Sequence, residues 1–155
     1  MEQINKKKNI LQIGVQFEGK NGLLEYNPLK NNKITCLYFS ASYSPPCQAF
    51  TPLLSEFYNE VNSEDKVLEI ILISLDKNKS DFQEYFSQMN WLAIPFDDSQ
   101  NRTEKCVQQF QVEQIPKLIP FRPNGQLITK NGRQDVINDG IAAFDNWLKE
   151  NQTEI

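Results

Sequence analysis

Histidine does not occur in this 155-residue chain, and its absence excludes several kinds of site. Imidazole is the commonest zinc ligand and the commonest general base in catalysis. Nucleophile pairs of the Ser-His or Cys-His type are therefore excluded, as are zinc sites that use histidine. We expect the chain to hold no metal and no other cofactor.

Cysteine is scarce as well, with three residues at Cys36, Cys47 and Cys106. An odd and sparse set is unlike the paired cysteines that staple small secreted domains. We therefore expect a reducing compartment, such as the cytoplasm.

Long apolar runs are missing. The most apolar stretches, Leu68–Leu75 and Trp91–Phe96, are much shorter than the roughly 20 residues that cross a bilayer. Met1–Asn9 contains three lysines but leads into no long apolar core, so we expect neither a secretory signal nor membrane insertion. The net charge of −4 gives no electrostatic reason to expect a nucleic acid partner.

The remaining composition is that of one folded domain, with 39% apolar and 11% aromatic residues. No repeat or Pro/Gly/Ser-rich linker divides the chain. We expect a flexible tail at residues 1–9, a single domain at residues 10–150, and a second tail at residues 151–155.

Hydrophobic periodicity and turn residues predict strands that alternate with helices. Residues 10–16 and 22–26 indicate a hairpin or a strand and turn, and Trp91–Phe96 indicates a short strand or an extended segment. The other predicted strands are Thr35–Ser40, Leu68–Leu75, and Leu118–Phe121 with Gln126–Lys130 around an Asn-Gly turn. The predicted helices are one following Pro45 and kinked at Pro52, then Asp81–Met89, Arg102–Val112 and Ile137–Lys149. We interpret Asp97-Asp98 as part of a solvated loop. This order favours a three-layer α/β sandwich with a mixed sheet.

Residues 38–47 read Tyr-Phe-Ser-Ala-Ser-Tyr-Ser-Pro-Pro-Cys. They resemble the active-site region of the nucleoredoxin and tryparedoxin branch of the thioredoxin superfamily, which reads Tyr-Phe-Ser-Ala-Ser-Trp-Cys-Pro-Pro-Cys. Further matches follow in chain order: Glu84–Phe86, Trp91–Asp98, Val112–Pro116, Asn124–Thr129 and Gly132–Arg133.

This resemblance implies a thioredoxin fold, with a central mixed sheet flanked by helices and an N-terminal β-hairpin extension. It also implies a cis peptide at Ile115-Pro116. In the resembling enzymes, a thiolate at a helix N-terminus attacks a substrate disulfide, and a second cysteine resolves the mixed disulfide.

The first of those two cysteine positions is Ser44 here, whereas Cys47 keeps the resolving position. A serine hydroxyl forms no disulfide, and the chain has no histidine to activate it. We expect Ser44 to cap the following helix, with Pro45 in the first helical position. Cys36 and Cys106 fall in a predicted strand and on a predicted helix, where we expect both to be core residues.

Two further departures from the family pattern lie at the same surface, and a third lies within a predicted strand. Tyr43 replaces the tryptophan before the first cysteine, and Lys117 replaces the threonine after the cis proline. Pro120 falls within a predicted strand, where it removes a backbone donor, so we expect a bulge or a distorted edge.

Our first hypothesis is a redox-inactive binding module, because the groove that holds extended peptide in the resembling enzymes remains. The groove residues are Tyr43, Pro45, Pro46, Ile115, Pro116 and Lys117. The expected partner is a protein or an extended peptide. By analogy with thioredoxin-like subunits of ciliary motors, a larger assembly is one candidate for that partner. A cilium is therefore a second compartment to consider.

Two alternatives remain open. The first is a thiol-disulfide oxidoreductase that works through Cys47 alone, with an external thiol as its resolving partner. The second is an engineered Cys-to-Ser trap of an active enzyme. An exposed Cys47 with a low pKa would favour chemistry, and a shielded one would favour the binding module.

Overall fold

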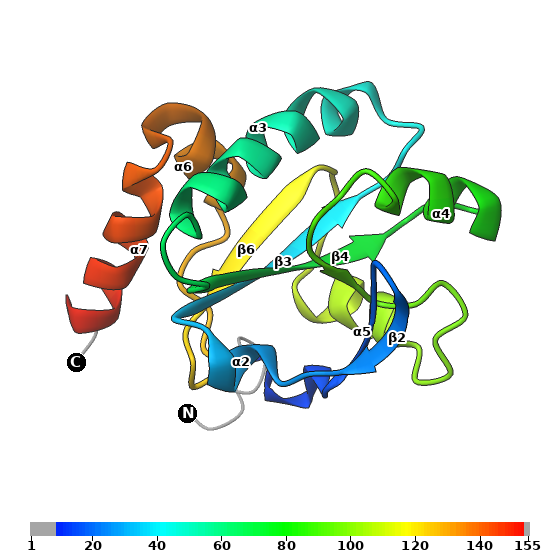
Figure 1. Ribbon diagram of the computed structural model, residues 1–155, viewed down its shortest axis with the longest axis horizontal. Helices are drawn as coiled ribbons and strands as arrows, with labels where there is room; N and C mark the ends of the chain where they lie inside the picture. Colours follow the sequence, from blue (N-terminus) through cyan, green and yellow to red (C-terminus); the bar gives the residue numbers. More distant parts are fainter. Residues whose placement is uncertain (1–8, 154–155) are drawn as a thin grey trace.

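The computed structural model describes residues 9–153 (Figure 1). Most of the first predicted tail and the last two residues of the second lie outside the described residues. The predicted domain end at residue 150 falls within the last helix, which runs to Thr153.

The six strands form one mixed sheet in the order β2-β1-β5-β4-β3-β6. They are β1 (Gln16–Gly19), β2 (Gly22–Glu25), β3 (Ile34–Ser40), β4 (Leu68–Ser74), β5 (Leu92–Ala93) and β6 (Lys117–Phe121). β4 runs parallel to β3 and to β5, and the other pairs are antiparallel. The predicted α/β class with a mixed sheet is confirmed.

Helices cover both faces of this sheet (Figure 1). The helical elements are η1 (Leu11–Ile13), α2 (Pro28–Asn31), α3 (Pro45–Val61), α4 (Lys79–Phe86), α5 (Arg102–Gln109), α6 (Gly132–Asp139) and α7 (Ala142–Thr153). The apolar faces of α3, α4 and α7 share one core cluster, whereas α5 and η1 contribute to a second.

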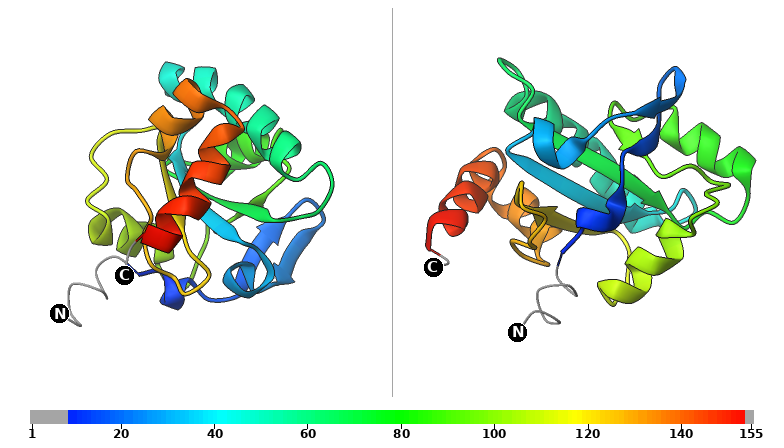
Figure 2. Two further views of the ribbon diagram at one scale, coloured as in Figure 1. Left: turned by 90° about the vertical axis from the view of Figure 1, so that its left-hand side faces the viewer. Right: turned by 90° about the horizontal axis from the view of Figure 1, so that it is seen from below.

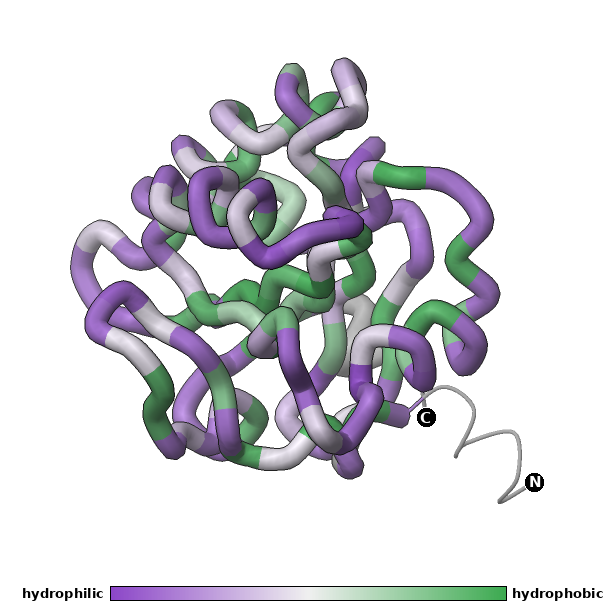
Figure 3. The backbone as a smooth tube through the Cα atoms, turned by 90° about the vertical axis from the view of Figure 1, so that its right-hand side faces the viewer, coloured by the Kyte–Doolittle hydropathy of each residue, from purple (hydrophilic) through white to green (hydrophobic). Residues whose placement is uncertain are grey.

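Successive side chains of the central strands point to opposite faces of the sheet, which explains the two core clusters. Tyr38 and Leu72 point into the first cluster, and their neighbours Leu37 and Ile73 point into the second. β3 is therefore buried at every position, as is typical of a strand between two helical layers. Figure 3 shows the same pattern, with hydrophobic segments through the centre and hydrophilic segments outside.

The N-terminal hairpin is present, but its first strand begins later than predicted. Gly14 has a φ of 80°, which interrupts extended backbone, so Leu11–Ile13 forms a 3-10 turn and β1 starts at Gln16. Residues 20 and 21 form the turn to β2. Apolar alternation alone did not reveal this glycine break.

The predicted single C-terminal helix is wrong, because the chain breaks at Gly140, with a φ of 55°, into α6 and α7. Figure 2 shows the change of direction between the two helices. The apolar spacing of Ile141 and Phe144 favours one buried helix face, but Ile141 is 50% exposed at the break and Phe144 is buried. The indole of Trp147 donates to Asp135 Oδ2 at 2.9 Å and ties α7 to α6.

Several elements end earlier or are shorter than predicted. The strand predicted at Trp91–Phe96 is reduced to β5, and α4 and α5 end three residues earlier than expected. The Asn-Gly turn forms, with the Gly125 amide donating to the Arg122 carbonyl at 2.8 Å. The strand expected after it makes only isolated bridges, one of which pairs Leu127 with Phe121.

The expected distortion at Pro120 is also wrong. The register between β3 and β6 runs without a break from Phe39–Lys117 to Thr35–Phe121. The Pro120 carbonyl instead accepts from the Ile128 amide at 2.9 Å, on the side away from β3. The nitrogen and the carbonyl of a strand residue point to the same side, so the missing donor faces outward and β3 loses no ladder bond.

Buried Arg102, at the start of α5, forms an ion pair and also contacts the N-terminal segment. The guanidinium of Arg102 contacts Asp98 through two hydrogen bonds of 2.9 and 3.0 Å, donates to the Ile13 carbonyl at 2.9 Å, and lies 5.4 Å from the Phe17 ring centroid. The prediction of a solvated Asp97-Asp98 loop is therefore wrong for Asp98. Burial acts to raise the pKa of Asp98, but the hydrogen bonds and charge of Arg102 outweigh it and lower that pKa.

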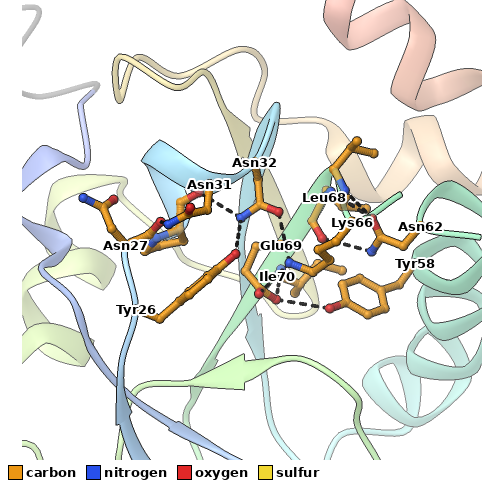
Figure 4. Close-up of polar contacts among 12 residues, drawn as sticks. Tyr26, Asn27, Asn31, Asn32, Tyr58, Asn62, Lys66, Leu68, Glu69 and Ile70 are labelled. Atoms are coloured by element: carbon orange, nitrogen blue, oxygen red, sulfur yellow. Dashed lines mark hydrogen bonds and ion pairs between the residues drawn. The ribbon is translucent and has the colours of Figure 1, made fainter. Parts of the chain in front are cut away.

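A second polar cluster lies at the amino ends of β3 and β4 (Figure 4). Buried Glu69 accepts from Lys66 at 2.8 Å and from Tyr58 at 3.3 Å. Lys66 also donates to Asn32, which in turn donates to the Tyr26 hydroxyl at 2.9 Å. Each buried polar group is thereby paired, as burial of charge requires.

We predict that Gly132→Ala destabilises the protein, although alanine normally favours a helix. A Cβ at Gly132 would lie 2.5 Å from the Leu118 carbonyl oxygen, because the start of α6 rests directly on β6. We expect the free energy of unfolding to fall by about 1–3 kcal/mol in urea titrations. Exposed Asp139→Ala, on the same helix, is the control and should change it by less than about 0.5 kcal/mol. An unchanged or raised stability of Gly132→Ala would contradict this packing.

Candidate functional site

The candidate site lies at the carboxyl ends of β3 and β4, where a short turn leads into α3 (Figure 1). Buried Asp76 fixes this turn. Its Oδ1 accepts from the amide and the hydroxyl of Ser42, at 3.0 and 2.6 Å, and its Oδ2 accepts from Ser74 at 3.1 Å. The turn is thus fastened to the end of β4.

Ser44 occupies the N-cap of α3, and the predicted cap is confirmed. Its backbone is extended, with φ −95° and ψ 116°, and its Oγ accepts from the Cys47 amide at 3.4 Å. Pro45 takes the first helical position, where a missing amide donor costs nothing. The Ser44 hydroxyl therefore serves the helix, and only 9% of the residue is exposed.

Cys47 is fully buried at 0% exposure and lies in the first turn of α3. Its carbonyl accepts from the Thr51 hydroxyl at 2.8 Å. Because this bond uses the single Thr51 proton, Tyr38 and Tyr85 must both donate to Thr51 Oγ1, at 2.6 and 2.7 Å. Tyr85 then accepts from Ser40 at 2.7 Å. A directed chain of hydroxyls therefore surrounds the first turn of α3.

The electrostatics of this chain favour neutral tyrosines. Burial raises the pKa of Tyr38 and of Tyr85, and the nearby Cys47 adds a smaller effect in the same direction. Both phenols therefore remain protonated and keep donating at physiological pH.

The other two cysteines are core residues, as predicted. Cys36 is fully buried in β3, and burial raises its pKa. Cys106 is 5% exposed on α5, and burial raises its pKa to about 12, although the charge of Arg102 acts to lower it. All three cysteines are free thiols.

The second wall of the predicted groove is the start of β6. The Ile115-Pro116 peptide bond is cis, and Lys117 pairs with Phe39 in the register, one residue before Ser40. Both walls therefore lie at the same end of the sheet. Pro116 itself is buried.

The walls differ in exposure. Tyr43 is 57% exposed, with the Lys77 ammonium 5.8 Å from its ring centroid, and both Pro45 and Pro46 are exposed. Ile115 and Lys117 are half-buried. The structure thus presents the predicted groove residues toward solvent, apart from Pro116.

Two hollows flank this site, and sequence reasoning found neither. A hollow of about 610 Å³ lies between α3 and α4, with Thr51 and Tyr85 in its lining beside Asp81 and Glu84. Another of about 500 Å³ adjoins Pro116 and is lined by Lys130 and Arg133 as well as Lys117. No periodicity signals these linings, because they combine residues far apart in the chain.

Residues 9–153 offer neither a metal-binding cluster nor a membrane-spanning helix. That range contains no group of three acidic or cysteine side chains placed to hold a metal ion. Nor does it contain a helix long and apolar enough to cross a bilayer.

Comparison with known proteins identifies the family. A model of thioredoxin-like proteins matches residues 31–127, and the chain therefore belongs to the thioredoxin-like family. It is 45% identical to tryparedoxin of Trypanosoma brucei brucei over 116 residues, which cover 74% of this chain and 79% of that protein. It is 37% identical to human nucleoredoxin over 116 residues, which cover 75% of this chain but only 26% of that protein.

A further relative and a solved structure show similar levels of identity. Probable nucleoredoxin 1 of Arabidopsis thaliana is 42% identical over 112 residues, which cover 72% of this chain and 19% of that protein. The chain thus spans only about a fifth to a quarter of the nucleoredoxins it matches. Among solved structures, tryparedoxin from Trypanosoma brucei superposes with a TM-score of 0.76 at 38% identity, over 86% of this chain and 92% of that one. The thioredoxin fold is confirmed.

We predict that Thr51→Val destabilises the protein by about 1–3 kcal/mol, because the buried hydroxyls of Tyr38 and Tyr85 lose their acceptor. Thr51→Ser keeps the hydroxyl and should retain most of the stability. Urea unfolding monitored by tyrosine and tryptophan fluorescence measures both. Equal stability of the valine and serine variants would contradict the directed hydroxyl chain.

Proposed function

We propose that this chain is a nucleoredoxin- and tryparedoxin-like binding module that does not exchange disulfides by the dithiol mechanism. The observation that carries the proposal is the role of Ser44. At the position where the resembling enzymes have their attacking cysteine, a serine hydroxyl caps α3 by accepting from the Cys47 amide.

The chemistry of the site supports this proposal. Dithiol exchange needs an attacking thiolate and a resolving thiol in the same turn. Ser44 supplies no thiol, and Cys36 and Cys106 are buried in β3 and α5. Cys47 alone remains at the site, with 0% exposure.

The remaining surface supports binding. The Tyr43–Pro46 turn and the Ile115–Lys117 segment lie at one end of the sheet. Tyr43, Pro45 and Pro46 are exposed there, and Lys117 is half-buried. We propose that a protein or an extended peptide docks between them, in the cytoplasm or another reducing compartment such as a cilium. We include a subunit of a larger assembly among the proposed partners. The three free thiols fit a reducing compartment.

The alternatives from the sequence are less well supported. An oxidoreductase that uses Cys47 alone needs an accessible thiolate, and the burial of Cys47 opposes that. An engineered trap would differ from an active enzyme at Ser44 alone, whereas Tyr43 and Lys117 also depart from the resembled pattern.

We predict that the native chain leaves insulin reduction by dithiothreitol at the background rate, because it lacks the attacking thiol. Ser44→Cys should accelerate the reaction, since it restores two thiols at the start of α3. The double variant Ser44→Cys/Cys47→Ser is the control and should lose most of that turnover. If the native chain reduces insulin above background and Cys47→Ser does not, the binding-module proposal is wrong. The chain would then be an enzyme that works through a single thiol.

A further inference from the structure

We propose that the hollow beside Pro116 receives an acidic segment of the partner protein, an inference that rests on the proposed function. The hollow is lined by three cationic side chains, Lys117, Lys130 and Arg133, and by one acidic residue, Glu113. Three positive charges less one negative charge leave a local excess of +2 on a chain whose net charge is −4. The charge of this surface is thus opposite to that of the whole molecule.

These cations are available to a partner. Within residues 9–153, the ion pairs involve Lys66, Lys79 and Arg102, and none involves a cation of the hollow. The hollow's Lys130 donates one hydrogen bond, of 3.2 Å, to the carbonyl oxygen of Phe110, which leaves its charge uncompensated. A carboxylate partner would supply that compensation.

Arg133 adds a further positive charge. Its Nε is buried and has no hydrogen-bond partner in the structure, although the residue as a whole is half-buried. That atom is closed off from solvent, so a bound segment would meet the charge of the guanidinium rather than the Nε donor. Arg133 lines the hollow together with Lys117, which follows the cis proline.

The other wall of the groove, formed by the Tyr43–Pro46 turn, also has a cation beside it. The Lys77 ammonium lies 5.8 Å from the ring centroid of Tyr43, so a cation also stands over the exposed aromatic residue of the turn. Cations on both walls would draw an acidic segment toward the groove and would disfavour a basic one.

A polypeptide fits this surface better than a nucleic acid. Half-buried Ile115 and exposed Tyr43 offer contacts to apolar side chains between the cations. A nucleic acid needs many phosphate contacts to offset repulsion by a protein of net charge −4, and the hollow provides only three cations. We therefore assign the hollow to a polypeptide segment that carries both acidic and apolar residues.

We predict that a fluorescein-labelled peptide of alternating glutamate and alanine binds the native chain, as measured by fluorescence anisotropy. Lys117→Glu should weaken binding about tenfold or more, because it places a like charge in the hollow. Lys117→Gln should have a smaller effect in the same direction. Lys20→Glu makes the same charge change in the β1–β2 turn, at the other edge of the sheet, and should leave affinity within about twofold.

The controls separate the outcomes. The charge assignment is overturned if the glutamate peptide does not bind, or if a glutamine-alanine peptide binds equally well. It is also overturned if Lys117→Glu and Lys20→Glu reduce the affinity for the glutamate peptide equally. Tighter binding of single-stranded DNA, lost in Lys117→Glu, would assign the hollow to a nucleic acid instead. Each of these results leaves the insulin assay unchanged, so failure of this inference is distinguishable from failure of the proposed function.

Discussion

The parallel pairing of β3 with β4 is the constraint on which the rest of the structure depends. Seven residues of each strand stay in register, and nearly all are buried between the two helical layers. Because the strands are parallel, their carboxyl ends meet at one edge, and the chain leaving β3 must turn there into α3. Asp76 fastens that turn to β4, so the position of Ser44 follows from the sheet.

At that edge, hydroxyl groups occupy the position where the resembling enzymes carry out thiol chemistry. Ser44 caps α3, and the chain from Ser40 through Tyr85 and Thr51 ends on the Cys47 carbonyl. These bonds stabilise the turn without requiring a reactive sulfur. The turn keeps its place at the edge of the sheet with Ser44 in the position of the attacking cysteine, as the proposed binding module requires. The cations beside Pro116 are the basis of the charge preference that we propose for it.

The sequence predicted the central elements of the fold but missed several breaks. The apolar runs of β3 and β4 and the helical spacing after Pro45 were unambiguous, and the family motif placed Ser44, Cys47 and Pro116. Gly14 and Gly140 interrupt elements whose apolar pattern continues across them, so periodicity alone predicted longer segments. The orientation of Pro120 and the ion pair of Asp98 depend on tertiary neighbours. For the same reason, no local pattern indicated that Lys130 and Arg133 join Lys117 around one hollow.

We propose that the first turn of α3 holds no reactive sulfur, because Ser44 caps the helix and Cys47 is buried. Intact-mass measurement after incubation of the folded chain with oxidised glutathione tests this most directly. The account predicts an unmodified mass for the native chain and modification of Ser44→Cys under the same conditions. A glutathione adduct on the folded native chain that is absent from Cys47→Ser would contradict it.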